Sequence, residues 1–136
     1  MSGKEKGIVD KMMREDFFSQ WLGIKVVDAS EGSCLLQMTV RKEMLNGFGI
    51  AHGGIAYSLA DSALAFAANG HGKVSLSIET SIAHFNKIVE GETILAEAVE
   101  IHKSNKIAKY SVEIFSLKGE KKALFSGTVY RSQRNH

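Results

Sequence analysis

The sequence NGFGIAHGGIAYSLADSALAFAAN occupies residues 46–69 and decides how the rest of the chain folds. Its second part, residues 54–69, is a strongly apolar, alanine-rich run that predicts a central helix after a Gly-rich loop over residues 43–53. One carboxylate, Asp61, interrupts the apolar run. Burying an ionised carboxylate costs free energy unless hydrogen bonds or charges compensate it. Packing alone would favour Ala or Leu at this position, so Asp61 requires a further explanation.

The segments around this helix have the alternating pattern of β-strands. Residues 24–30 and 34–41 predict a hairpin that turns at Glu31-Gly32. From Val74 to Ile82, apolar and polar residues alternate as in a half-buried strand, with Val74, Leu76, Ile78, Thr80 and Ile82 on the buried face. The alternation slips at residues 83–85, where we expect a bulge or the end of the strand. Three further strands are predicted at residues 92–103, 106–117 and 122–132.

An amphipathic helix that packs on a core is predicted at residues 8–22, because apolar residues recur there at helical spacing. These residues are Ile8, Val9, Met12, Met13, Phe17, Trp21 and Leu22. The order is then helix, two strands, long helix and four strands. One long helix against a mostly antiparallel sheet of about six strands, with an N-terminal helix beside it, is an α+β architecture. The length of 136 residues is that of one domain, so we expect residues 1–136 to form a single unit.

Composition excludes several classes of function. The net charge is +2 and the longest block of like charges is two residues, so neither nucleic acid nor a membrane is expected as a partner. No apolar leader segment is visible at the N-terminus, and the apolar helix is interrupted by polar groups. The single cysteine, Cys34, fits a reducing, cytoplasmic location and leaves no disulfide framework. The five histidines are scattered, so no zinc site is expected.

On the predicted helix, Asp61 shares a narrow polar stripe with Ser58 and Ser62. The helix begins near Gly53 and Gly54, whose backbone amides carry no side chain that would block an anion or a polarised carbonyl oxygen. Two interpretations of Asp61 stay open on this evidence, a structural hydrogen-bond acceptor and a functional group. His52 is equally ambiguous, since it fits either a turn histidine or a catalytic base.

Taken together, these residues resemble the signature of the hotdog-fold acyl-CoA thioesterases. Asn46 is followed after five residues by His52-Gly53-Gly54 and after six more by Asp61, at the start of a long Ala-rich helix. The nearest type is the phenylacetic acid degradation (PaaI-like) group. The resemblance covers almost the whole chain, including the serine-rich strand VSLSIETSIAHF and the closing strands.

The resemblance implies a hotdog fold, a homodimer with the active site at its interface, commonly a homotetramer as a dimer of dimers, and an acyl-CoA substrate. Asp61 of one subunit would act as nucleophile or general base on a thioester held by the turn His52, Gly53 and Gly54 of the other. The Gly53 amide would be the oxyanion donor, and Asn46 would position the thioester or the water. A base and one oxyanion donor suffice for this reaction, so we expect no cofactor and no metal.

Three further positions follow from the resemblance. Ser77 matches a residue that orients the water, with Thr80 and Ser81 as competitors. Lys106 falls where family members often contact the coenzyme A phosphates. Many members carry Phe-Arg-Pro or Leu-Arg-Pro after the serine-rich strand, whereas this chain has Phe85-Asn86-Lys87. Lys87 could replace the arginine as a point charge but not as a bidentate donor.

Two other functions compete with thioester hydrolysis. A hotdog enoyl-CoA hydratase or dehydratase pairs a histidine with a carboxylate in a different arrangement, and absorbance of an enoyl thioester would reveal it. A non-catalytic acyl-CoA-binding protein would not need Asp61, and would bind acyl-CoA tightly without turnover. The sequence does not fix the acyl group, which can be aromatic, as in phenylacetyl-CoA, or of medium chain length. Residues that could line its pocket are Phe48, Ile50, Tyr57 and Trp21.

Overall fold

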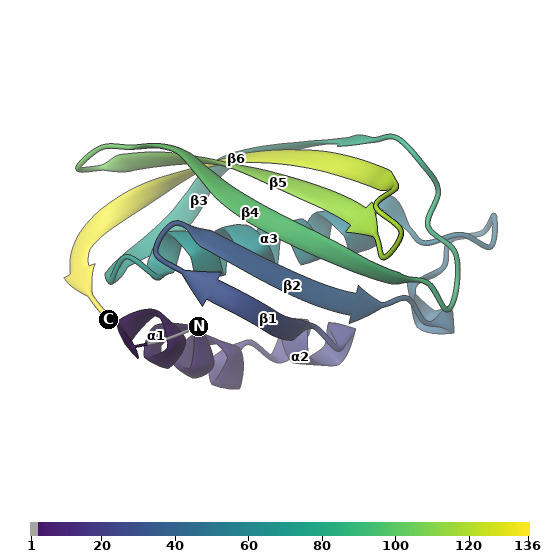
Figure 1. Ribbon diagram of the computed structural model, residues 1–136, viewed down its shortest axis with the longest axis horizontal. Coiled ribbons are helices and arrows are strands. Elements are labelled where there is room, and N and C mark those ends of the chain that lie inside the picture. The colour runs from purple at the N-terminus through teal and green to yellow at the C-terminus, as the bar shows by residue number, and fades with distance from the viewer. Residues whose placement is uncertain (1–2) are drawn as a thin grey trace.

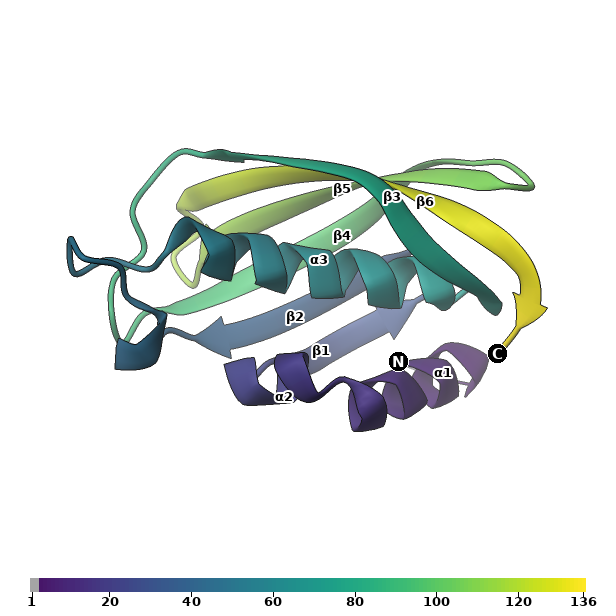
Figure 2. The ribbon, with the colours of Figure 1, turned by 180° about the vertical axis from the view of Figure 1, so that it is seen from behind.

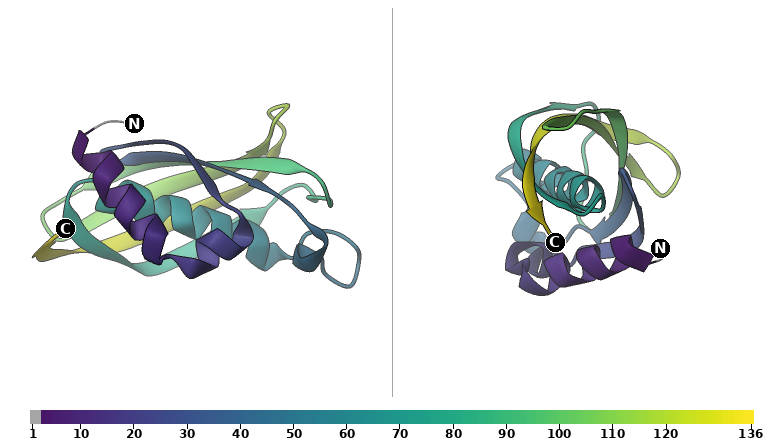
Figure 3. Two further views of the ribbon diagram at one scale, coloured as in Figure 1. Left: turned by 90° about the horizontal axis from the view of Figure 1, so that it is seen from below. Right: turned by 90° about the vertical axis from the view of Figure 1, so that its left-hand side faces the viewer.

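One long helix lies inside a curved sheet. The computed structural model describes residues 3–136, and its central element is α3, Gly53–Asn69. Six strands form one antiparallel sheet in the order β1-β2-β4-β5-β6-β3, which wraps around α3 (Figures 1 and 3). The strands are β1 (Lys25–Ser30), β2 (Ser33–Thr39), β3 (Lys73–His84), β4 (Thr93–Lys103), β5 (Ile107–Ser116) and β6 (Lys121–Asn135). The predicted α+β architecture is therefore confirmed, with every strand in its expected place.

Two helices precede the sheet where one was predicted. They are α1 (Gly3–Glu15) and α2 (Phe17–Leu22), and both lie beside the open side of the curved sheet (Figure 2). The expectation of a continuous helix over residues 8–22 is wrong because Asp16 starts a new helix. Its side chain accepts a hydrogen bond of 2.9 Å from the backbone N–H of Ser19, which is the usual action of an N-cap aspartate.

The break at Asp16 changes which side chains of α2 face the core. Ser19 and Leu22 are buried, whereas Phe17 is 70% exposed and Trp21 is 54% exposed. The sequence pattern placed Phe17 and Trp21 on the packed face, because it continued the phase of α1 through the break. In the structure Trp21 instead lies under the guanidinium of Arg41, 4.5 Å from its ring centre.

The register of β3 against β6 shifts between Ser77 and Glu79, as at a β-bulge. Because side chains alternate between the faces of a strand, a one-residue shift exchanges the two faces. Before the bulge, Ser75 is buried on the α3 side, where its backbone N–H donates to Asn69 of that helix at 2.9 Å, and Ser77 follows on the same face. After it, Thr80 and Ile82 face inward.

Because of this exchange of faces, the predicted burial of the first half of the strand is wrong. Leu76 and Ile78 were expected on the buried face, but they are 70% and 60% exposed. The uniform alternation in the sequence gives no sign of the bulge that turns them outward. The expected end of the strand near residues 83–85 is confirmed, since β3 ends at His84.

Close approach of α3 to the sheet depends on Gly127 in β6. A Cβ atom added at Gly127 would lie only 2.7 Å from Cδ2 of Leu64, in the buried part of α3. We therefore expect Gly127→Ala to lower the free energy of unfolding by about 1–3 kcal/mol, the usual cost of overpacking a core. Urea denaturation measures the change. Gly47→Ala is the control, because no atom lies within 4 Å of its added Cβ, and an equal loss in both variants would contradict the packing argument.

Candidate active site

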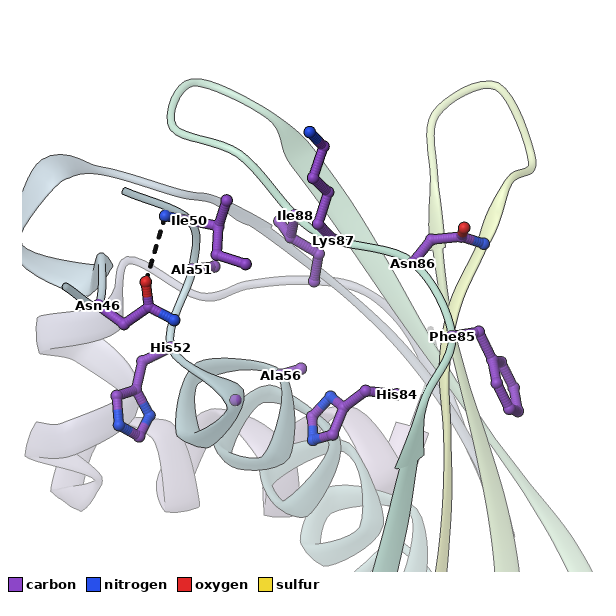
Figure 4. Close-up of a pocket in the computed structure, with 11 residues that line it drawn as sticks. Asn46, Ile50, Ala51, His52, Ala56, His84, Phe85, Asn86, Lys87 and Ile88 are labelled. Carbon is purple, nitrogen blue, oxygen red and sulfur yellow. Dashed lines mark hydrogen bonds between the residues drawn. The ribbon is translucent and has the colours of Figure 1, made fainter. Parts of the chain in front are cut away.

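A cavity of about 320 Å³ lies at the start of α3. The loop before α3 and the first turn of the helix form one side, and the segment that follows β3 forms the other (Figure 4). The loop begins with the short 3-10 helix η1 (Lys42–Met44) and closes on itself through a bridge between Leu45 and Ala51. The cavity is lined by Asn46, Ile50, Ala51, His52, Gly53, Ala56, His84, Phe85, Asn86, Lys87 and Ile88.

The first turn of α3 leaves a single backbone amide available. His52 is the N-cap residue, and its Nδ1 accepts a 2.9 Å hydrogen bond from the N–H of Gly54. The first amides of a helix have no acceptor within the helix itself. The N–H of Gly53 has no acceptor elsewhere in residues 3–136 either. Among the predicted substrate contacts, His52 and the amide of Gly54 thus already bind one another, whereas the Gly53 amide is open to the cavity.

Asn46 supports the loop from inside. Its Oδ1 accepts hydrogen bonds from the N–H of Phe48 at 2.9 Å and, more weakly, from the N–H of Ile50 at 3.4 Å. Its side-chain nitrogen has no partner within the described residues, and Asn46 borders the cavity, so this N–H₂ group is free to meet a ligand. Of the residues suggested for an acyl pocket, Ile50 lines the cavity, while Phe48 is 91% exposed and points into solvent.

The two predicted phosphate contacts lie far apart in one chain. Lys87 borders the cavity at the start of α3, and its side chain extends away from the helix (Figure 4). Lys106 is exposed in the turn between β4 and β5, at the opposite end of the sheet (Figure 1). Arg131 belongs to β6 and donates a 2.7 Å hydrogen bond to the carbonyl of Ser104 in that turn.

Asp61 borders a second, smaller cavity of about 180 Å³, between α3 and β3. Ser77 borders it as well, because of the bulge in β3. Of the competitors of Ser77, Thr80 binds the hydroxyl of Tyr57 at 2.6 Å, and Ser81 does not line this cavity. Within residues 3–136 the carboxylate of Asp61 forms no hydrogen bond, so it does not act there as a structural acceptor.

Burial raises the pKa of the Asp61 carboxyl above its ordinary value, and the nearby negative charge of Asp16 raises it further. Asp16 is held in place by Ser19, whose backbone N–H and hydroxyl both donate to its carboxylate, at 2.9 and 2.6 Å. The Ser19 hydroxyl also lies 2.8 Å from that of Ser62, next to Asp61 in α3. A half-buried carboxylate with a raised pKa and no hydrogen-bond partner is typical of a functional group.

The chain alone does not bring the Gly53 amide and Asp61 together. They are eight residues apart on one helix, which corresponds to about 12 Å along its axis. Asn46, His52 and Gly53 border one cavity, while Asp61 and Ser77 border the other. Each chain therefore holds these predicted site residues in two separate cavities.

His84 was not among the predicted site residues, although it borders the larger cavity. It is exposed and lies beside Gly53. The only sequence signal for it was the slip of the alternating pattern at residues 83–85, which marks the end of β3 without showing which way the ring points.

The described residues meet the requirements of neither a metal site nor a reactive cysteine. In the described part of the chain, no three His, Cys, Asp or Glu side chains gather closely enough to hold a metal ion. Cys34 is buried, and burial, with a smaller contribution from the charge of Asp28, raises the pKa of its thiol to about 12.

Over residues 3–136, no helix has the length and apolar character needed to cross a membrane.

Comparison with known proteins shows the family to which this fold belongs. The thioesterase superfamily profile matches residues 48–123. A putative esterase of Archaeoglobus fulgidus is 41% identical over 91% of this chain and 80% of its own length. The acyl-coenzyme A thioesterase PaaI of Escherichia coli is 33% identical over 96% of this chain and 94% of its own. The solved structure of the E. coli PaaI protein from the phenylacetic acid degradation operon superposes with a TM-score of 0.95 at 31% identity, covering 97% of this chain and 96% of that one.

A long helix wrapped by a six-stranded antiparallel sheet, together with these relatives, places the chain among the hotdog-fold thioesterases. The chain belongs to the thioesterase superfamily and is of the PaaI type within it.

Proposed function

We propose that this protein hydrolyses an acyl-CoA thioester to the free acid and coenzyme A, at a site shared by two copies of the chain. The observation that carries the proposal is the separation of the Gly53 amide and Asp61 into two cavities of one protomer. Groups about 12 Å apart cannot act on one carbonyl, but two copies can combine the helix start of one with the carboxylate of the other. The names of the relatives, acyl-coenzyme A thioesterase and esterase, support the substrate class.

Each group has one role in this proposal. The Gly53 N–H donates to the thioester oxygen and stabilises the negative charge that develops there. Asp61 of the other copy removes a proton from the attacking water, or attacks the carbonyl carbon itself. Ser77, which shares the Asp61 cavity, orients the water, and the free amide of Asn46 positions the thioester. His52 and Gly54 hold the turn in shape through their mutual hydrogen bond.

Binding of coenzyme A would draw on both copies as well. Lys87 lies beside the Gly53 cavity, and Lys106 lies at the opposite end of the sheet, so both can meet the phosphates of one ligand only across an interface. The exposed Leu76 and Ile78 on edge strand β3 provide apolar surface for that interface. We propose that residues 1–136 form one hotdog domain. We also propose that two chains form a homodimer, that two dimers form a homotetramer, and that the protein is cytoplasmic.

The direct test is release of free thiol from phenylacetyl-CoA and from a series of medium-chain acyl-CoAs. The proposal predicts turnover of at least one of these substrates, with free acid and thiol formed in equal amounts. Absence of thiol release across the series would contradict it, and so would tight binding without turnover. Light scattering after gel filtration determines the number of chains in the assembly.

A complementation experiment tests whether the site is shared. Gly53→Pro removes the N–H at the first helical position, where proline is tolerated, and the preceding His52 already has the extended backbone that proline requires. Asp61→Asn removes the base. Each variant alone should be inactive, but co-expression should restore about a quarter of the activity, because half of the dimers are mixed and one of their two sites is intact. No restoration would contradict a shared site.

The charge of Asp16 should set the pH range of activity. Asp61 accepts a proton only when ionised, so activity should rise with pH through its raised pKa. Asp16→Asn removes the neighbouring charge and keeps an oxygen that can cap α2. The acid limb of the kcat profile should therefore move to lower pH. An unchanged limb, or one moved to higher pH, would contradict the coupling of the two carboxyl groups.

A further inference from the structure

His84 is the first residue of the cavity wall that faces the start of α3. A Cβ atom added at Gly53 would lie 3.3 Å from Nε2 of His84 and 3.5 Å from its Cε1. Figure 4 shows the imidazole rings of His84 and His52 on either side of the first turn of α3. The ring of His84 therefore lies directly beside the residue whose amide is open to the cavity.

The hydrogen bonding of His84 differs from that of three other histidines, His52, His71 and His136. His52 accepts from Gly54, His71 lies 2.6 Å from a carboxylate oxygen of Glu100, and His136 lies 2.7 Å from Oδ1 of Asn69. No group within the described residues pairs with either ring nitrogen of His84. A histidine in a cavity with both nitrogens unpaired can exchange a proton with a ligand.

The position of His84 along the wall indicates which atom of the ligand it would meet. The wall runs from His84, beside Gly53, through Phe85 and Asn86 to Lys87. If the thioester oxygen binds at Gly53 and the phosphates lie toward Lys87, the arm of coenzyme A follows this wall. Its first atom after the carbonyl carbon is the thioester sulfur, which then lies next to His84.

We propose that His84 is the acid that protonates the departing thiolate, an inference that rests on the proposed hydrolysis. Water adds to the carbonyl carbon as its proton passes to Asp61. When the tetrahedral intermediate collapses, the carbon–sulfur bond breaks and its electron pair goes to sulfur, which takes the proton from Nε2 of the His84 imidazolium and leaves the neutral ring. Asp61 then returns its proton through solvent to His84. The products are a carboxylic acid and a thiol, and no other reactant is required.

Dependence on the leaving group tests this role. An aliphatic thiol such as that of coenzyme A has a pKa near 8.5, similar to cysteine, and gains from protonation as it leaves. An aryl thiol is more acidic and leaves readily as the anion. Turnover of phenylacetyl-CoA and of the phenylacetyl thioester of thiophenol is therefore compared for the wild type, His84→Ala and His84→Gln, at saturating substrate.

His84→Ala should lower kcat for phenylacetyl-CoA roughly ten- to a hundred-fold, as expected for loss of a hydrogen bond to a charged atom. For the aryl thioester the loss should be less than about three-fold, and His84→Gln should lie between wild type and His84→Ala because it still donates an N–H. Equal losses on both thioesters, or no loss on either, would overturn the proposal. Failure of the proposed hydrolysis itself would appear separately, as a wild-type enzyme inactive on both.

Since His84 is exposed, neither substitution should disturb folding, and circular dichroism with a thermal melt checks this. A KM effect without a kcat effect would assign His84 to substrate binding instead and would also overturn the role as acid.

Discussion

Replacing Asp61 by asparagine is expected to lower kcat about 10²–10⁴-fold, the usual contribution of a positioned general base, with little change in folding. The substitution keeps the size of the side chain and removes only its ability to take a proton. Because the carboxylate has no hydrogen-bond partner within residues 3–136, no internal contact is lost. Burial already disfavours the charge, so the neutral amide should leave the free energy of unfolding unchanged or slightly higher.

Asp10→Asn is the matched control. Asp10 is an aspartate of α1 that pairs with Lys6 on the surface at 2.8 Å, and both side chains are about half exposed. The substitution Asp10→Asn should leave thiol release at the wild-type rate. Release by Asp61→Asn within a few-fold of wild type would show that the carboxylate is not the base and would remove the main support for hydrolysis at this site.

Lys122 is a buried cation behind the larger cavity, and its removal is the second substitution with a large expected effect. The side chain is 6% exposed and lies 3.0 Å from a carboxylate oxygen of Glu92, with Glu120 beside it. Burial alone would lower the pKa of Lys122, but the hydrogen bonds and charges of Glu120 and Glu92 raise it above its usual value. Lys122 also donates a 2.9 Å hydrogen bond to the carbonyl of Lys87, in the cavity wall.

Lys122→Met should lower the free energy of unfolding by about 3 kcal/mol, because it leaves Glu92 and the Lys87 carbonyl partly buried without their partner. Urea denaturation measures this loss. Lys121→Met is the control: its pair with Glu113, 3.6 Å apart, is about half exposed and should be worth less than 1 kcal/mol. Equal effects in the two variants would mean that the buried pair does not stabilise the fold.

The arrangement of elements was predictable because each depends on a local pattern. The Ala-rich run gave α3, and turns such as Glu31-Gly32, where Gly32 has a φ of 78°, gave the ends of the strands. The features that were wrong or missed depend on a competing local hydrogen bond and on the pairing between strands. The capping bond of Asp16 competes with continuation of a helix, and the bulge after Ser77 changes the strand faces without changing the residue pattern.

For the candidate site, the resemblance named residues and divided them between two subunits, and these assignments stay predictions, but the sequence could not show the surroundings of each side chain. Asn46, Gly53 and Asp61 could be named because their spacing resembles a known signature, and the structure gives each of them a free polar group at a cavity. The pKa of Asp61 is raised first by burial and further by the charge of Asp16, and the sequence does not show this approach of Asp16 from a different helix. The same is true of His84, whose position beside Gly53 arises where a strand end meets a helix start.

The bulge between Ser77 and Glu79 divides β3 into two stretches that can vary separately over evolutionary time. Residues 80–84 keep their own pairing with β6, so selection for core packing acts there without altering the orientation of Ser75 and Ser77. Deleting the extra residue would rejoin the stretches and rotate one of them by half a turn of the strand, which would either bury Leu76 or expose Ile82. Relatives should therefore tolerate substitutions on both sides of this point far better than they tolerate a one-residue deletion within it.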